Sequence, residues 1–414
     1  MTASENFVIV GAGLAGAKAA EALRTKGFDG QIILIGDESD RPYERPPLSK
    51  GYLNGSDERD SVFVHEPDWY DQHRVELRLR TTVTGIERGA HQVQLGDGSS
   101  VGYSKLLLAT GSQPRSLDVP GAHAAGVHYL RRLGDCDALR QTLSSVSRLI
   151  VIGAGWIGLE VTAAARQASV DVTVVEAAEL PLLRVLGPEA ARVFADLHRS
   201  HDVDLRLKAL TSEITTEDGR ATGVRLHDGT VLGADAVLMA VGAEPAVRLA
   251  VDAGLNVDNG IFVDESLRSS DEDIFAVGDV ANALHPVLGK HIRVEHWANA
   301  LNQPETAASA MLGGPASYSE LPYFYTDQYD LGMEYVGYVE PGGYDRVVFR
   351  GDVATREFIA FWLTGGRVLA GMNVNVWDVT DPIKALIASG AAVDPAKLAD
   401  PDTPLDQLVS VNSG

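Results

Sequence analysis

Gly11-Ala12-Gly13-Leu14-Ala15-Gly16 and Gly153-Ala154-Gly155-Trp156-Ile157-Gly158 are two copies of one glycine pattern in a single chain. In such a pattern the first glycine lets a strand turn tightly, the second lets the backbone approach a pyrophosphate, and the third packs a helix against the strand. The start of that helix offers unpaired N–H groups to the phosphates. The duplication therefore predicts two dinucleotide sites.

The segments around both glycine turns have the pattern of a strand, a turn, a helix and a second strand. Buried parallel strands are expected as continuous apolar runs and the helices as runs of good helix formers. The strand, helix and second strand of the first unit are expected at Phe7–Val10, Ala17–Arg24 and Gln31–Ile35, and those of the second unit at Leu149–Ile152, Leu159–Arg166 and Asp171–Val175.

An acidic residue follows the second strand of each unit. Glu176 comes 23 positions after Gly153, near the spacing of a carboxylate that accepts hydrogen bonds from ribose hydroxyls, and Asp37 comes 26 positions after Gly11. Glu176 would repel a 2′-phosphate and favour NAD over NADP, unless Arg184 compensates the charge. Either acid could instead be a solvated residue at a strand end.

Composition excludes several classes of function. The chain has 414 residues, enough for two or three domains, and a formal net charge of −22, which disfavours binding to nucleic acid or to an anionic membrane. It has no apolar run long enough for a transmembrane helix and no signal-peptide pattern at its N-terminus, so we expect a cytoplasmic protein. The single cysteine, Cys136, excludes an intrachain disulfide, a CxxC pair and a cysteine-ligated iron–sulfur cluster, and its acidic neighbours predict an inert thiol.

The rest of the chain shows a repeat at the level of domains. In each half an antiparallel crossover and a strand ending in glycine follow the dinucleotide unit. Three prolines predict that residues 41–50 form an extended loop without helix. The strand Asp273–Asp279 could close the first sheet and place Asp279 at its ligand-binding edge. From about Thr326 the pattern changes to a small antiparallel sheet, followed by a helix at Pro382–Ala388.

Several of these segments resemble the FAD-dependent NADH:ferredoxin reductases, the family of the putidaredoxin, rubredoxin and aromatic-ring dioxygenase ferredoxin reductases. The resemblance covers nearly the whole chain. Besides the two glycine turns, it rests on Pro42-Tyr43-Glu44-Arg45-Pro46-Pro47-Leu48-Ser49-Lys50, Leu108-Ala109-Thr110-Gly111, Leu159-Glu160, Ala276-Val277-Gly278-Asp279 and Val294-Glu295-His296-Trp297-Ala298-Asn299-Ala300.

The resemblance implies an α/β fold of the glutathione-reductase-like flavoproteins, with two Rossmann-like dinucleotide-binding domains and a C-terminal α+β interface domain. FAD would occupy residues 1–115 with 245–325, NAD residues 116–244, and the interface domain residues 326–414.

The resemblance also assigns roles to single residues. Ala15 and Asp37 would hold the ADP part of FAD, Val83 would contribute backbone at the adenine, and Arg131 would contact the flavin side. Asp279 would bind the ribityl chain and Trp297 would lie against the isoalloxazine. Lys50 and Glu160 would form the catalytic pair beside the nicotinamide. The full set of expected cofactor-binding residues is Gly11, Gly13, Leu14, Ala15, Gly16, Asp37, Arg45, Lys50, Val83, Ala109, Thr110, Gly111, Arg131, Gly153, Gly155, Trp156, Ile157, Gly158, Glu160, Glu176, Gly242, Gly278, Asp279, Glu295, His296 and Trp297.

The implied activity is transfer of hydride from NADH to FAD and of single electrons to a ferredoxin, which would serve a cytochrome P450 or an aromatic-ring dioxygenase. The protein would be a monomer or a homodimer. One cysteine excludes a disulfide reductase of the same architecture. An NADH oxidase, a monodehydroascorbate-type reductase and an interaction flavoprotein remain alternatives. We expect no metal site, and we expect His198 and His201, on a polar helix, to lie at the surface.

Overall fold

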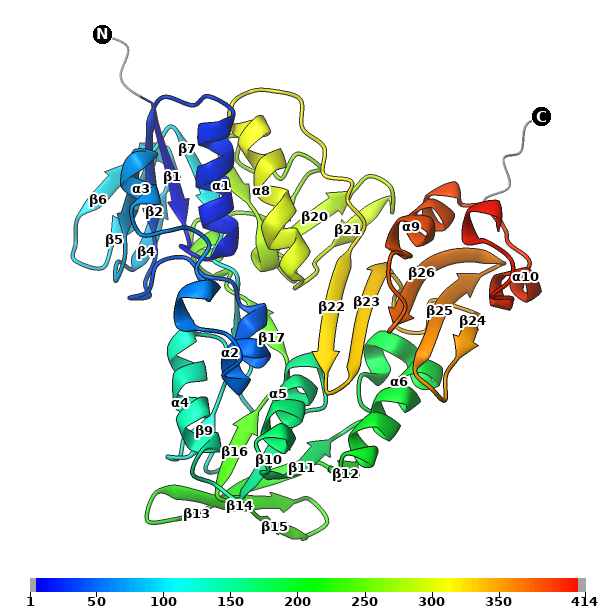
Figure 1. The fold of residues 1–414 in the computed structure, drawn as a ribbon. Coiled ribbons are helices and arrows are strands. Elements are labelled where there is room, and N and C mark those ends of the chain that lie inside the picture. Colours follow the sequence, from blue (N-terminus) through cyan, green and yellow to red (C-terminus); the bar gives the residue numbers. More distant parts are fainter. Residues whose placement is uncertain (1–4, 409–414) are drawn as a thin grey trace. The chain divides into compact units, whose positions relative to one another are not determined.

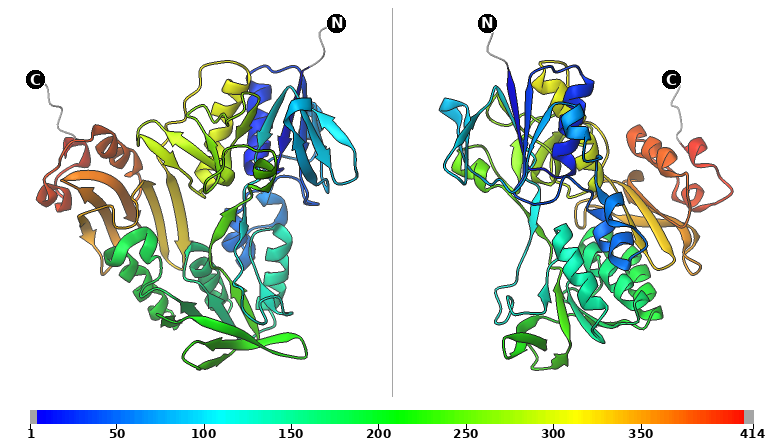
Figure 2. Two further views of the ribbon diagram at one scale, coloured as in Figure 1. Left: turned by 180° about the vertical axis from the view of Figure 1, so that it is seen from behind. Right: turned by 60° about the vertical axis from the view of Figure 1, so that its left-hand side comes forward.

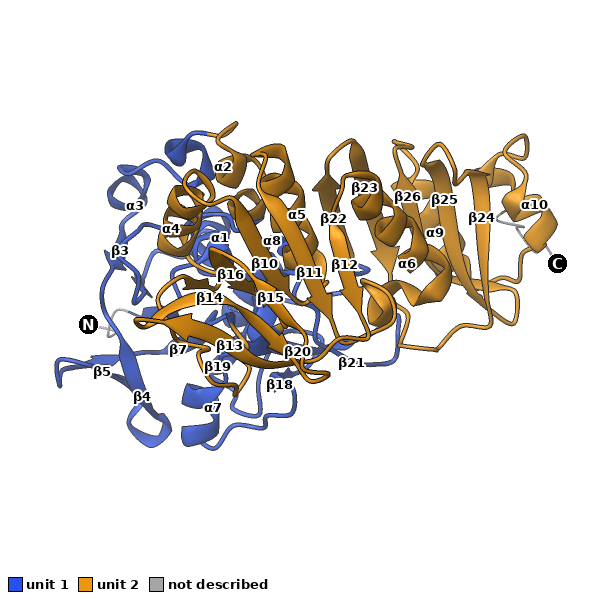
Figure 3. Cartoon of the chain, turned by 90° about the horizontal axis from the view of Figure 1, so that it is seen from below, with its two compact units in different colours: residues 1–46, 58–113, 243–322 blue, residues 47–57, 114–242, 323–414 orange. Residues whose placement is uncertain are grey.

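The computed structural model describes residues 5–408, and the chain forms two compact units (Figure 3). Unit 1 contains Met1–Pro46, Glu58–Gln113 and Ala243–Pro322. Unit 2 contains Pro47–Asp57, Pro114–Gly242 and Tyr323–Gly414. The division into an FAD, an NAD and an interface domain remains a prediction.

Unit 1 is built on a five-stranded parallel sheet. In spatial order its strands are β19 (Ile274–Ala276), β7 (Lys105–Leu108), β1 (Asn6–Val10), β2 (Gln31–Ile35) and β3 (Val75–Arg78). Strands β1, β2 and β7 are buried and mainly apolar. Helices α1 (Leu14–Thr25) and α8 (Trp297–Met311) pack side by side against it (Figure 1). The strand expected at Asp273–Asp279 therefore closes this sheet as β19, and the glycine turn, the acid after β2 and Asp279 all follow carboxyl ends of its strands.

Smaller elements complete unit 1. They are the antiparallel meander β4 (Val83–Glu87), β5 (Gln92–Leu95) and β6 (Ser100–Gly102), the sheet β18 (Ile261–Val263), β20 (Ala281–His285) and β21 (Lys290–Ile292), the short helices α3 (Trp69–Gln72) and α7 (Arg248–Asp252), and the pair β8 (Ser112–Pro114) and β17 (Ala243–Pro245).

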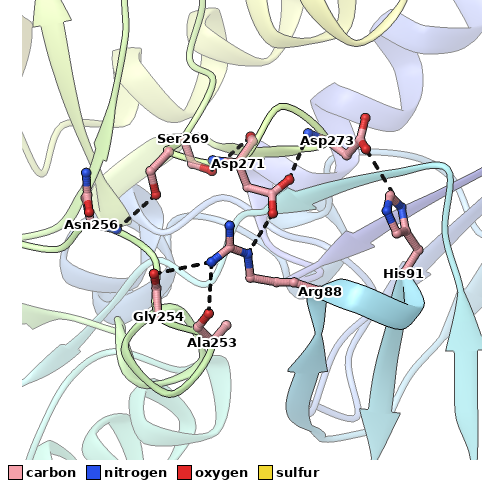
Figure 4. Close-up of polar contacts among 9 residues, drawn as sticks. Arg88, His91, Ala253, Gly254, Asn256, Ser269, Asp271 and Asp273 are labelled. Carbon is pink, nitrogen blue, oxygen red and sulfur yellow. Dashed lines mark hydrogen bonds and ion pairs between the residues drawn. The ribbon is translucent and has the colours of Figure 1, made fainter.

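Arg88 ties three of these segments together (Figure 4). It lies just after β4, and its Nε is 2.6 Å from a carboxylate oxygen of Asp271. Its Nη1 donates to the carbonyls of Ala253 and Gly254, which end helix α7. Burial raises the pKa of Asp271, but hydrogen bonds from Arg88 and from the Asp273 amide lower it more, so the pKa is below its ordinary value. The side chain of Arg88 thus joins the meander, the end of α7 and the segment leading into β19.

Unit 2 contains the second five-stranded parallel sheet. Its order is β12 (Asp204–Leu207), β11 (Asp171–Glu176), β10 (Arg148–Ile152), β16 (Ala236–Met239) and β9 (Val127–His128). The helices of this part are α2 (Gly51–Asn54), α4 (Leu133–Leu143), α5 (Trp156–Gln167) and α6 (Leu183–Ser200), and a small antiparallel sheet comprises β13 (Thr211–Glu217), β14 (Arg220–Leu226) and β15 (Val231–Gly233). Both strand–turn–helix–strand units predicted from the glycine turns are confirmed.

The C-terminal part of unit 2 is a five-stranded antiparallel sheet, visible in yellow and orange in Figure 2. Its strands, in spatial order, are β22 (Tyr323–Gln328), β23 (Leu331–Gly337), β26 (Arg367–Val374), β25 (Glu357–Thr364) and β24 (Arg346–Asp352), followed in the chain by α9 (Thr380–Ser389) and α10 (Pro395–Ala399). The buried Trp362 on β25 donates from its indole nitrogen to the Leu186 carbonyl on α6 at 3.0 Å. This bond ties the antiparallel sheet to the helices of the same unit.

One expectation about local structure is wrong. The proline-rich segment is not extended throughout, because Pro46–Ser49 forms one turn of 3₁₀ helix. Proline has no N–H to lose in a first helical turn and its φ suits one, so Pro46 and Pro47 start the turn that leads into Lys50.

Within residues 5–408, no helix combines the length and the apolar character needed to cross a membrane.

Candidate functional site

The first glycine turn fits its role for steric reasons. Gly11 has φ of 112°, and a Cβ there would lie 2.1 Å from the carbonyl oxygen of Ala109, which follows the neighbouring strand β7. A Cβ on Gly16 would lie 2.0 Å from the Gly11 carbonyl oxygen. These two glycines therefore let strand, turn and helix pack closely, as the fingerprint requires.

A cation lies over the middle of this turn. A Cβ on Gly13 would come within 3.1 Å of Nη1 of Arg45, and Arg45 pairs with Glu38 at 3.3 Å. Gly13 also precedes α1, whose first amides point out of the helix. Backbone donors and a guanidinium thus converge at one place, which is the donor set that a pyrophosphate needs.

Asp279 and its neighbours form the opposite side of the unit 1 site. Asp279 lies three residues after the end of β19 and accepts a hydrogen bond from Ser112 Oγ at 2.9 Å. The preceding Gly278 has φ of 75°, and a Cβ there would lie 3.3 Å from Cβ of Ala15. The Gly278 amide donates to the side chain of Gln303 on α8 at 2.7 Å. The structure therefore brings Ala15, Gly278 and Asp279 together at the carboxyl edge of the sheet.

Trp297 opens helix α8 and is held by the proline-rich segment. Its Nε1 donates to Glu44 at 3.1 Å. Burial lowers the pKa of the adjacent His296 to about 4, with Asp279 opposing the shift, so this imidazole is neutral at pH 7. Glu295 pairs with Arg293 at the same helix start.

The remaining predicted residues of unit 1 lie along the same edge. The exposed Asp37 follows β2, and Val83 starts β4 shortly after Thr81, whose amide bonds the Gly36 carbonyl at 2.9 Å. Leu14 is buried in the first turn of α1, and Ala109, Thr110 and Gly111 follow β7. Lys50 and Arg131 belong to unit 2, where the Arg131 amide donates to Asp135 at the start of α4.

The second glycine turn repeats the steric plan and leaves room at its centre. A Cβ on Gly153, where φ is 99°, would lie 2.4 Å from the Ala240 carbonyl oxygen, and one on Gly158 would lie 2.2 Å from the Gly153 carbonyl oxygen. A Cβ on Gly155 would meet no atom of the described residues within 4 Å. Gly155 thus faces open space, where a pyrophosphate could approach the backbone.

That space belongs to a cavity of about 420 Å³ in unit 2, lined by Gly155, Trp156, Glu176, Arg184 and Gly242 among others. Both carboxylate oxygens of Glu176 accept backbone hydrogen bonds, one from Ala154 at 2.7 Å and one from Ala178 at 2.8 Å. Each oxygen retains a second lone pair that can accept a bond from a ribose hydroxyl.

Two basic side chains lie in this part of unit 2. Arg184 lines the cavity, as the sequence suggested, whereas Lys208 pairs with Glu179 at 3.1 Å and was not anticipated. The ring of Trp156 packs against Phe194 and Phe324, so this large residue fills space below the turn, while Ile157 is exposed.

Glu160 on α5 is the most enclosed charged group of unit 2, with only 4% of its surface exposed. Its Oε1 is 2.7 Å from Nζ of Lys50 and accepts a hydrogen bond from Thr326 at 2.6 Å. Its Oε2 accepts a hydrogen bond from Ser49. The expected Lys50–Glu160 pair is therefore formed, and two hydroxyls surround the carboxylate besides the ammonium.

Neighbouring groups define the electrostatics of this pair. The ring of Tyr325 lies 5.3 Å from Nζ of Lys50, close enough for a cation–π contact. Burial raises the pKa of Asp327, and Glu160 raises it further while Lys50 opposes the shift. A buried ion pair is tolerated only when its remaining hydrogen-bonding positions are filled, and Ser49 and Thr326 fill them.

Sequence reasoning missed Ser49, Thr326 and Glu44 and misplaced one histidine. His198 is fully buried instead of lying at the surface, and burial lowers its pKa to about 4. Its Nε2 lies 2.9 Å from the side-chain oxygen of Gln328. His201 on the same helix is half-buried.

Cys136 is buried, and its Sγ donates to the Leu48 carbonyl at 3.2 Å. Burial and Asp137 raise the pKa of this thiol to about 12, with Arg140 opposing the shift. Both features agree with the expectation of an inert thiol, which stays a prediction.

Comparisons with known proteins cover both parts of the chain. Residues 5–304 match the family described as pyridine nucleotide-disulphide oxidoreductase, and residues 323–409 match the family described as reductase C-terminal. Rhodocoxin reductase of Rhodococcus erythropolis is 41% identical over 98% of this chain and 94% of its own length. The ferredoxin–NAD(+) reductase component of the anthranilate 1,2-dioxygenase system of Burkholderia cepacia is 43% identical over 96% of this chain and 98% of its own length.

A chain in the solved structure of a covalent putidaredoxin reductase–putidaredoxin complex matches with a TM-score of 0.94 at 38% identity. The match covers 99% of the present chain and 99% of the matched chain. The expected fold class is thereby confirmed. The chain belongs to the pyridine nucleotide-disulphide oxidoreductase family, as a flavoprotein of the FAD-dependent NADH:ferredoxin reductase type.

Proposed function

We propose that this protein takes hydride from NADH through bound FAD and passes single electrons to a ferredoxin that serves a cytochrome P450 or an aromatic-ring dioxygenase. One observation carries the proposal: the chain has two dinucleotide turns but a single, buried cysteine. Electrons that reach the flavin therefore have no dithiol to enter and must leave for another molecule. The relatives include reductases of P450 and dioxygenase systems.

We assign the FAD site to unit 1. The glycine turn, Arg45 and the start of α1 would hold the pyrophosphate, Asp37 and Val83 the adenosine, and Asp279 the ribityl chain, with Trp297 against the ring system. Bound FAD supplies the redox chemistry, which is acceptance of a hydride and release of electrons one at a time. The residues of this chain bind and orient it and hold charge near it.

We assign the NADH site to the cavity of unit 2. Gly153, Gly155 and Gly158 would admit the pyrophosphate, and Glu176 would accept the ribose hydroxyls and disfavour a 2′-phosphate. Glu160 and Lys50 would lie beside the nicotinamide. In this ion pair the Lys50 ammonium would be held in one orientation and the charge of the Glu160 carboxylate would be neutralised. The pair would therefore act through preorganised electrostatics and not as a general acid or base.

We place this activity in the cytoplasm, where NADH is supplied and where a chain with one cysteine needs no disulfide.

A reconstituted electron-transfer assay tests the proposed function. The purified protein should carry flavin absorbance, and NADH-dependent reduction of cytochrome c should rise steeply when a [2Fe–2S] ferredoxin of a P450 or dioxygenase system is added. Oxygen consumption measured in parallel is the control. Oxygen consumption that accounts for all NADH oxidised, with no effect of the ferredoxin, would instead identify an NADH oxidase.

A further inference from the structure

A line of buried polar side chains crosses unit 2 from helix α6 to Glu160. His198 on α6 and Thr326 on β22 are fully buried, and Gln328 at the end of β22 is 1% exposed. Burying polar groups costs free energy unless each finds a hydrogen-bond partner. Three such residues in succession therefore need an explanation beyond the packing of a helix on a sheet.

The side chains form one continuous series of hydrogen bonds. Tyr329 Oη lies 3.4 Å from His198 Nδ1, and His198 Nε2 lies 2.9 Å from Gln328 Oε1. Gln328 Nε2 donates to Thr326 Oγ1 at 3.2 Å, and Thr326 Oγ1 donates to Glu160 Oε1 at 2.6 Å. The series begins at a half-buried tyrosine and ends on the carboxylate that binds Lys50.

The chemistry of the end group sets the direction of every bond. An ionised carboxylate only accepts, so the Thr326 hydroxyl must give its proton to Glu160 and accept from the Gln328 amide nitrogen. The amide oxygen of Gln328 then faces His198, which must carry its proton on Nε2 and leave Nδ1 to accept from Tyr329. All four protons point toward Glu160, and bonds aligned in this way strengthen one another.

The protonation state of His198 agrees with this direction. Burial lowers its pKa to about 4, and the nearby His201 lowers it further while the bond to Gln328 opposes the shift. The imidazole is therefore neutral at pH 7 and can donate from one nitrogen while accepting at the other.

We propose that Thr326, Gln328 and His198 are positioning residues that hold the Glu160 carboxylate, and through it Lys50, in one orientation. The inference rests on the proposed function of Glu160 beside the nicotinamide. Oε1 receives Lys50 and Thr326 together while Oε2 receives Ser49, so loss of the Thr326 donor leaves Oε1 held by Lys50 alone and loosens the orientation of the carboxylate. Hydride transfer then slows, whereas NADH binding at the glycine turn and Glu176 persists.

The test compares Thr326→Val, which removes the hydroxyl at constant shape, with Thr326→Ser, which keeps a donor. Thr162→Val is the matched control, because Thr162 is also fully buried, lies on the same helix as Glu160 and donates to the Gly158 carbonyl instead. Flavin reduction by NADH is followed in rapid-mixing experiments, which separate the limiting rate constant from the apparent Kd for NADH.

We expect T326V to lower the limiting rate constant roughly tenfold with the Kd changed less than about twofold, since a hydrogen bond to a buried charge is lost. T326S should recover most of the rate and T162V should leave it unchanged. A T326V rate equal to that of T162V would overturn the inference. Glu160→Gln, measured alongside, separates failure of this inference from failure of the proposed function. An unchanged rate in E160Q would overturn the proposed role of Glu160 itself.

A second readout does not depend on activity. In protein carrying ¹⁵N-labelled histidine, the resonances of His198, identified by their loss in His198→Gln, should show a neutral ring protonated at Nε2 that does not titrate between about pH 5 and 8. Tyr329→Phe should shift the Nδ1 resonance, whereas Tyr344→Phe, which removes a hydroxyl bonded to Glu189, should not. A ring protonated at Nδ1, or one that titrates near its ordinary pKa, would overturn the inference even if T326V failed to retain FAD.

Discussion

Glu176 illustrates how one residue combines structure with selection of the nucleotide. Its two oxygens already accept amides of the glycine turn and of the loop after β11, so the carboxylate is held in place before any ribose arrives. In the proposed NADH site, the same negative charge would face the 2′-phosphate of NADPH. Replacing the whole side chain would therefore mix loss of the scaffold with loss of the charge, and an isosteric change is needed to separate them.

Glu176→Gln removes the charge and keeps one acceptor oxygen, so that one of the two backbone hydrogen bonds, from Ala154 or from Ala178, is retained. We expect the preference for NADH over NADPH, as the ratio of kcat/KM values, to fall about tenfold, because removing a like charge favours the 2′-phosphate. Steady-state kinetics with both nucleotides measure the ratio. The control is Glu179→Gln, an exposed acid paired with Lys208, which should change the ratio far less. Equal effects of the two variants would mean that general surface charge sets the preference.

Lys50 is a charge whose removal we expect to lower both stability and the rate of the reaction, because it pairs with the buried Glu160. Lys50→Met leaves the buried Glu160 without its cation, and breaking such a pair costs roughly 3–5 kcal/mol of stability. We expect a lower Tm together with slower flavin reduction by NADH. In the double variant Lys50→Met/Glu160→Gln the Tm should largely recover, because no uncompensated charge remains, while flavin reduction stays slow. Recovery of both would show that Lys50 serves stability alone.

Residue by residue, the sequence predicted what local pattern can encode. The apolar run locates β2 at Gln31–Ile35, because a strand buried on both faces is apolar at successive positions, here Ile32–Ile35 after the exposed Gln31. Thr326 lies 166 positions from Glu160 in the sequence. No local sequence pattern can predict a hydrogen bond between two residues so far apart. His198 was misplaced because its polar side chain lies on the buried face of α6, next to Phe194 and Leu197, where the partner Gln328 comes from a distant strand.

At the scale of elements, Arg88 links the meander of unit 1 to the segment after helix α7 and to the segment before β19. Arg88 contacts Asp271 and the last carbonyls of α7, so it fills acceptors that a helix end leaves open. Both groups of the ion pair are partly exposed. The ion pair between Arg88 and Asp271 should therefore contribute about 1 kcal/mol to stability, as expected of a surface pair within a hydrogen-bond network and less than a buried pair would.

Arg88→Met should lower the free energy of unfolding by about that amount near neutral pH. The pKa of Asp271 is lower in the folded state than its unfolded value of about 3.9, so the stabilisation is present above that pH and is lost as the pH falls through the folded pKa. The difference in Tm between wild type and R88M should therefore shrink as the pH falls through the folded-state pKa of Asp271, as thermal melts across pH would show. A constant difference at all pH values would exclude Asp271 as the partner that matters. Arg248→Met, which removes an exposed pair within α7, is the control.

The proline-rich segment shows why element boundaries are harder to predict than element types. Three prolines argued against helix, yet Pro46–Ser49 makes a 3₁₀ turn, since proline is excluded from helix interiors but not from first turns. The two Rossmann-like units were predictable because their strands, turns and helices repeat one pattern at close spacing. The association of the antiparallel sheet with the second of them was not, since it depends on contacts such as that of Trp362 with Leu186.

For the whole molecule, a single cysteine leaves no dithiol to accept electrons from the flavin, so the proposed transfer to ferredoxin should not need Cys136. Cys136→Ser keeps a donor for the Leu48 carbonyl, and we expect NADH-dependent reduction of ferredoxin to remain within about twofold of wild type. Coupled cytochrome c reduction measures this transfer. Wild-type protein should also react slowly with a thiol reagent at pH 8, since the pKa of Cys136 is raised to about 12. Loss of ferredoxin reduction in C136S with normal flavin reduction by NADH would point to a sulfur in the electron path.

The membership of Pro47–Asp57 has a consequence for exchanging parts between relatives. This segment belongs to unit 2, although the residues on either side of it belong to unit 1, and it carries the lysine that neutralises Glu160. A chimera that transplants the pyridine-nucleotide half as Pro114–Gly242 with the C-terminal sheet would bring the acid but leave its native cation behind. Functional domain swaps in this family should therefore require three inserted segments. The eleven-residue segment Pro47–Asp57 decides whether the transplanted unit brings its own lysine.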